Sequence, residues 1–78
     1  MRKLIKHPNN RILGKTIRFI RKDKKISGNL IAKHLDITHQ QLMKYETGKN
    51  RIPAIMLWKI AEFSSVDIKI FFKDLVGF

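Results

Sequence analysis

Apolar residues recur along the chain at spacings that are typical of helices. Leu13, Ile17 and Ile20 stand at positions i, i+4 and i+7, with basic side chains between them. They therefore predict a first helix with one apolar stripe. The side-chain oxygen of Asn9 or Asn10 can cap the start of this helix, and the basic run after Ile20 suits the negative end of its dipole.

A short second helix is predicted from about Gly28 to Leu35. Ser27 is its expected N-cap, and its inner face consists of Ile31, Ala32 and Leu35. The pattern then breaks at Asp36-Ile37, before the polar residue Thr38 restarts it. The stretch predicts a helix followed by a tight turn.

The third helix is predicted over about residues 38–47. Thr38 and Gln41 fit a capping box, in which the Thr hydroxyl accepts from an N–H three residues on and the Gln side chain reaches back. Gly48 then supplies a left-handed exit, which glycine takes at little cost. Two helices joined by such a short turn are typical of a helix-turn-helix.

The third helix has two chemically different sides. Leu42 and Tyr45 are three residues apart and are expected to pack inward. The opposite side is polar and is expected to face solvent; it carries His39, Gln40 and Lys44.

Two further helices complete the predicted fold. Pro53 is suited to the first turn of a fourth helix, whose inner stripe consists of Ala54, Leu57, Ile60 and Ala61. Asp67 is the expected cap of a last helix that runs from Ile68 to about Leu75. Since no useful strand-like alternation occurs, the prediction is an all-α fold of five helices, with a basic arm over residues 1–8 and one domain over residues 9–78.

The charge balance narrows the choice of partner. The 78 residues hold 17 Lys and Arg against six Asp and Glu, a formal net charge of +11. A polyanion relieves the self-repulsion of such a chain, so nucleic acid is the favoured partner and an anionic membrane surface is second. Ten of the basic side chains lie in residues 1–25, whose only acid is Asp23. Each of these basic side chains, taken singly, is equally consistent with a solvent-exposed surface position that binds no partner.

Several classes of function are excluded or disfavoured. The absence of cysteine excludes disulfides and thiolate metal sites, and Asp36 with His39 lacks further ligands, so we expect no metal and no cofactor. No catalytic triad or glycine-rich phosphate loop is present, so we expect no enzyme. The longest apolar run, residues 54–58, is far shorter than the ~18 residues that span a bilayer. We therefore expect a soluble, cytoplasmic protein that does not bind membranes.

Most of the chain resembles the Cro/repressor, or XRE, family of lambda-repressor-like helix-turn-helix domains. The segments that carry the resemblance are "LGKTIRFIRKDKKIS", "IAKHLDIT", "QLMKYETGKNRI" and "LWKIAEFSSVDIKIFF". The resemblance implies double-stranded DNA as the partner, with residues 38–47 as the recognition helix and with His39, Gln40 and Lys44 reaching the base edges. Whether His39 contacts a base or a phosphate stays open.

The resemblance also implies roles outside the recognition helix. The loop that follows it would bind DNA phosphates through Thr47, Lys49, Asn50 and Arg51. Arg21 and Glu46 match a structural salt bridge of the family. The N–H groups at the start of the second helix form a further anion site, contributed by Ser27, Gly28 and Asn29.

Two positions depart from the family pattern. Gly28 stands where relatives usually carry a glutamine that contacts phosphate and supports the recognition helix. Asp36 stands where the turn usually has a left-handed glycine, and aspartate accepts that conformation at a cost of ~1 kcal/mol.

The C-terminal segment is more apolar than one small core needs. An exposed apolar patch usually marks an interface, and relatives often dimerise through the last helix, so we expect a homodimer interface that contains Phe71, Phe72, Leu75 and Phe78. The sequence thus predicts a transcriptional regulator, most simply a nucleoid-associated repressor of a near-palindromic operator. The alternative is an antitoxin that uses the same domain on DNA and its apolar tail on a toxin protein. A basic amphipathic helix over residues 1–25 at a membrane surface is a weaker rival.

Overall fold

The first helix, α1 (Pro8–Asp23), carries the predicted apolar stripe. In the computed structural model, which describes residues 8–75, Ile17 and Ile20 are fully buried and Leu13 packs partly against them. The helix already begins at Pro8, because the fixed φ of proline suits a first turn. Asn9 and Asn10 lie inside that turn, so the predicted cap at one of them is wrong.

The second and third helices have close to the predicted bounds and have the predicted cap residues, but the Gln41 side chain does not make the return bond of the predicted capping box. Helix α2 (Gly28–Leu35) is capped by Ser27, whose hydroxyl accepts a hydrogen bond from the Leu30 N–H at 3.1 Å. Helix α3 (His39–Glu46) is capped by Thr38, whose hydroxyl accepts from the Gln41 N–H at 3.0 Å. Each cap satisfies one of the N–H groups that a helix start leaves without a partner.

The turn between α2 and α3 depends on Asp36. Its φ of 60° and ψ of 42° are left-handed, as the family pattern led us to expect. In that conformation its N–H reaches the carbonyls of Ala32 and Lys33, and the next N–H, of Ile37, donates to Ala32 at 3.0 Å. These bonds end α2 within one residue and set the direction of α3.

Helix α4 (Ala54–Ser64) begins one residue later than its sequence suggested. Pro53 has a ψ of 144° and is the extended N-cap residue, not the first helical residue. Leu57, Ile60 and Ala61 are buried, but Ala54 is exposed, because the first turn extends beyond the core. Ala54 was therefore wrongly placed in the inner stripe.

The last element is η1 (Ile68–Phe71), a 3₁₀ helix. Asp67 caps it as predicted, by accepting from the Lys69 N–H at 2.9 Å. The expected α-helix to Leu75 does not form; i→i+3 bonds such as Phe72 N–H to Lys69 C=O replace it. The all-α class is confirmed, but residues 8–75 form four α-helices and one 3₁₀ helix where five α-helices were predicted.

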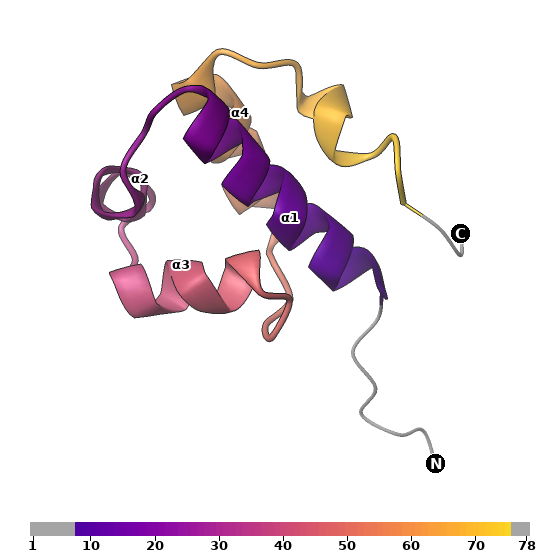
Figure 1. Ribbon diagram of the computed structural model, residues 1–78, viewed down its shortest axis with the longest axis horizontal. Helices are drawn as coiled ribbons and strands as arrows, with labels where there is room; N and C mark the ends of the chain where they lie inside the picture. Colours follow the sequence, from indigo (N-terminus) through magenta and orange to yellow (C-terminus); the bar gives the residue numbers. More distant parts are fainter. Residues whose placement is uncertain (1–7, 76–78) are drawn as a thin grey trace.

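Helix α1 is the central element of the arrangement. It crosses in front of α4, with α2 and α3 on one side of it and η1 on the other (Figure 1). The core between them contains the buried side chains Ile17, Ile31, Leu42, Ile60 and Phe71. Within residues 8–75 no helix has the length and apolarity needed to cross a membrane.

Candidate nucleic-acid interface

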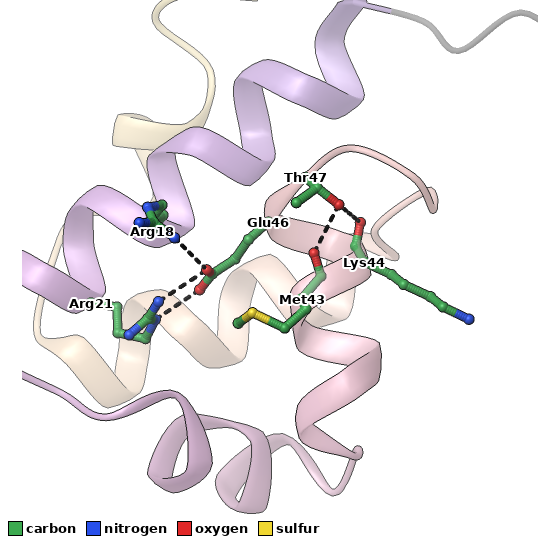
Figure 2. Close-up of polar contacts among 6 residues, drawn as sticks. All are labelled: Arg18, Arg21, Met43, Lys44, Glu46 and Thr47. Carbon is green, nitrogen blue, oxygen red and sulfur yellow. Dashed lines mark hydrogen bonds and ion pairs between the residues drawn. The ribbon is translucent and has the colours of Figure 1, made fainter.

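The two sides of α3 are separated as the sequence predicted. Leu42 is completely buried and Tyr45 is 7% exposed. His39, Gln40 and Lys44 are all exposed. Lys44 points away from α1 (Figure 2), so the structure brings an imidazole, an amide and an ammonium to the outer side of a short, capped helix.

Glu46, the acid of α3, faces inward. Its Oε2 accepts from Arg21 Nε at 2.8 Å and its Oε1 from Arg21 Nη2 at 3.0 Å, while Arg18 Nη1 lies 3.9 Å from Oε1 (Figure 2). The hydrogen bonds that Arg21 donates to Glu46 raise the pKa of Arg21 above its ordinary value, against the lowering effect of burial. The pair thus forms as expected. Because the Glu46 side chain is only 2% exposed, the outer side of α3 is free of negative charge.

A close contact with α1 fixes the position of α3. A Cβ atom on Gly14 would lie 2.3 Å from the Tyr45 carbonyl oxygen and 2.6 Å from that of Glu46. No side chain fits there, so the backbone of α1 approaches the C-terminal end of α3 directly. Sequence reasoning missed this role, since Gly14 is distant from α3 along the chain.

The loop after α3 folds back on the helix. Gly48 has a φ of 78°, which is the predicted left-handed exit, and the Lys49 N–H donates to the Lys44 carbonyl at 2.9 Å. Both the hydroxyl and the N–H of Thr47 donate to the Met43 carbonyl, at 2.9 and 3.0 Å, so Thr47 has little to offer a ligand. Thr47 is itself exposed, and the other exposed residues of this loop are Lys49, Asn50 and Arg51.

The same loop lies against the start of α1. A Cβ atom on Gly48 would lie 2.9 Å from Arg11 Cα. Arg11 is exposed, so a further basic residue begins beside the loop. Sequence reasoning missed Arg11, because nothing local signals a contact across 37 residues.

The start of α2 lies beside the start of α3. A Cβ atom on Gly28 would lie 2.7 Å from His39 Nε2 and 3.0 Å from His39 Cδ2. The imidazole therefore occupies the space in which a side chain at position 28 would begin. The N–H groups of Gly28 and Asn29, at the same helix start, have no partner within the helix.

The predicted dimer residues differ in their exposure to solvent. Phe71 is completely buried in the monomer core, so its assignment to an interface is wrong. Phe72 is 48% exposed and Leu75 is half-buried. Phe78 and the basic side chains of the N-terminal arm lie outside the described residues.

Comparison with known families and proteins agrees with this geometry. The sequence profile of the helix-turn-helix family matches residues 17–71. An uncharacterised HTH-type transcriptional regulator of Rickettsia conorii is 43% identical over 63 residues, which are 81% of this chain and 50% of that protein. One of Sinorhizobium medicae is 37% identical over 65 residues, 83% of this chain and 47% of that protein. The chain thus spans about half the length of the curated relatives it matches.

A solved structure shows the same fold. The clp gene regulator ClgR from C. glutamicum superposes with a TM-score of 0.76 over 81% of this chain and 82% of that one. Only 17% of the residues are identical, so this likeness concerns the fold alone.

Proposed function

The chain belongs to the helix-turn-helix family, and we propose that it is a non-enzymatic, sequence-specific DNA-binding regulator of transcription. The observation that carries the proposal is the exposed polar row on α3, which stands on a helix whose inner side is fixed to α1. In this mode the N-terminal part of α3 enters the major groove of double-stranded DNA.

Two residues of the row are suited to base recognition. The amide of Gln40 matches the N6 and N7 atoms of adenine, and the ammonium of Lys44 matches the O6 and N7 atoms of guanine. Both side chains are exposed. Gln40 and Lys44 therefore determine the DNA sequence that is preferred.

His39 contacts a phosphate in this proposal. Its imidazole lies over Gly28, which is the first residue of α2. A helix start is a natural anion site, and an imidazole N–H adds a donor to it. Gly28 and Asn29 then bind one phosphate together with His39, while Ser27 caps the helix that presents them.

A second set of phosphate contacts comes from the loop after α3. Lys49, Asn50 and Arg51 are exposed there, and Arg11 of α1 lies beside them. Thr47 adds little, because both of its protons are already donated. These contacts set the position of the domain on DNA and most of its affinity.

The regulator acts as a homodimer in the same proposal. Of the predicted interface residues that the structure describes, Phe72 and Leu75 remain available to a second copy. A two-fold dimer would place its recognition helices about 34 Å apart on a near-palindromic operator. Occupancy of such a site at the nucleoid would block polymerase, which makes repression the simplest outcome.

A selection from randomised DNA duplexes tests the proposal. We expect one enriched, near-palindromic site that binds two chains, as measured by sedimentation. If ~8 phosphates are neutralised, the slope of log K against log salt is about −7. A selection without enrichment, or a slope near zero, would contradict the proposal.

A matched pair of variants separates base recognition from charge. Lys44→Ala and Lys69→Ala each remove one positive charge, and both lysines are exposed. We expect Lys44→Ala to relax the preference at one base pair by about 1–3 kcal/mol, and Lys69→Ala to leave the preference unchanged. Equal effects would show that only charge matters.

A further inference from the structure

A groove lies between α1 and η1, and no residue of α3 lines it. It has a volume of about 370 Å³. Its walls are formed by Ile12, Lys15, Thr16 and Phe19 of α1, and by Ile70 of η1 with Lys73 beyond it. The DNA-binding proposal leaves this groove without a role.

The α1 wall of the groove is a second apolar stripe. Ile12 and Phe19 are seven residues apart, two helical turns, on the side that Ile17 and Ile20 do not occupy. Phe19 is 61% exposed, more than any other large apolar side chain among residues 8–75. Thr16 adds no free donor, because its hydroxyl donates to the Ile12 carbonyl at 3.0 Å.

The charges at the groove are mainly positive. Lys15 and Lys73 line it, and neither forms an ion pair within residues 8–75. Asp74 is the one acid of the lining. Because the groove has an apolar floor and unpaired ammonium groups at its edge, a complementary ligand has an apolar side with acidic groups next to it.

We propose that this groove binds an acidic amphipathic helix of a partner protein. Two turns of α1 span about 10 Å, which suits a helix that inserts apolar anchors at i, i+4 and i+7. A second copy of this chain fits this groove poorly, because it has no acidic helix to place beside Lys15 and Lys73: each helix within residues 8–75 carries at most one acid. DNA fits poorly as well, since its phosphates gain nothing from the exposed ring of Phe19. The proposal does not depend on the DNA-binding function.

Two synthetic peptides of the same composition test the proposal. The first, of about 18 residues to allow helix formation, has leucines at i, i+4, i+7 and i+11 and glutamates between them. The second has the same residues in an order that leaves no apolar side. We expect the first peptide to bind the full chain about tenfold more tightly, as measured by fluorescence anisotropy. Equal binding of both peptides would overturn the proposal, because charge alone would then explain it.

Variants with matched controls locate the binding site. Phe19→Ala is expected to weaken binding of the first peptide about tenfold, whereas Trp58→Ala, at an aromatic residue that is 49% exposed on α4, changes it less than about twofold. The double variant Lys15→Glu, Lys73→Glu is expected to abolish binding. Its control, Lys33→Glu with Lys69→Glu, changes the net charge equally and retains most of the binding. Circular dichroism checks that each variant is folded.

Two other outcomes would assign the groove differently. If the chain does not bind the first peptide but associates with itself, and if Phe19→Ala weakens that self-association, the occupant of the groove is a second copy. If a DNA duplex shifts the NMR amide resonances of Ile12, Phe19 and Ile70 more than those of α3, the groove belongs to the DNA interface. Either result overturns the proposal.

Discussion

The two sides of α3 are held in very different ways. On the inner side, Leu42 is completely buried and Glu46 is bonded twice to Arg21. On the outer side, Gln40 and Lys44 are exposed. One helix of eight residues thus has a side that fixes its position and a side that is free to change. The contrast predicts that free energies of unfolding depend on the inner side, whereas DNA preference depends on the outer side.

A large loss of stability is expected from Gly14→Ala. In an ordinary helix this change stabilises a protein by about 0.5–1 kcal/mol. Here the new Cβ would lie 2.3 Å from the Tyr45 carbonyl oxygen, and both atoms belong to backbones that cannot turn aside. We expect the free energy of unfolding to fall by about 3 kcal/mol, the upper end of the usual cost of overpacking. Urea denaturation measures it, and a stabilised variant would mean that the helices do not meet at Gly14.

Glu46→Ala is expected to cost about 2 kcal/mol, a typical value for hydrogen bonds to charged groups. The variant leaves Arg21 in place, with a side chain that is only 13% exposed and has lost its partner. The control is Glu62→Ala, which removes an exposed acid from α4 and is expected to have little effect. A Glu46→Ala variant that melts like the native chain but binds DNA differently would place Glu46 on the functional side.

Local signals are the part of the structure that the sequence predicted well. The caps at Ser27 and Thr38 act across three residues, and the left-handed Asp36 acts within its own turn. The two sides of α3 follow from spacing alone. Such features need no knowledge of the rest of the chain.

The failures involve contacts between distant segments. The last helix was predicted to reach Leu75, but Phe71 is drawn into the core and a 3₁₀ helix forms instead. The closeness of Gly14 to α3, and of Arg11 to the loop after it, joins residues more than 30 positions apart. The resemblance to the XRE family supplied the Arg21–Glu46 pair, which spacing alone would not have found.

Gly28 of α2 lies against residues from both sides of α3, His39 on the outer side and Leu42 on the inner side. Gly28→Ala is expected to change the free energy of unfolding by less than about 1 kcal/mol. Its Cβ would also meet an atom closer than 3.0 Å, but that atom is the end of the His39 side chain, which can rotate. We therefore expect the imidazole to move away from α2 and affinity for DNA to fall severalfold. Urea denaturation and binding to the selected duplex measure the two effects.

The comparison between Gly14→Ala and Gly28→Ala tests this interpretation directly. Both replace a buried glycine by the same residue, and helix propensity alone predicts no loss of stability at either position. A large loss of stability at position 28 would mean that His39 is a fixed part of the fold, and its assignment to a phosphate contact would fail.

The smallest change in stability is expected from the double variant Gln40→Ala, Lys44→Ala. Both side chains are exposed, and alanine is the best helix former, so the free energy of unfolding should stay within about 0.5 kcal/mol of the native value. The same variant should lose its preference for the selected site over a random duplex, because both of the proposed base contacts are removed. Leu42→Ala, on the buried side of the same helix, is the opposite control and should cost about 2–5 kcal/mol. If the double variant were destabilised as strongly as Leu42→Ala, the outer side would contribute to the core, and a recognition surface there would be ruled out.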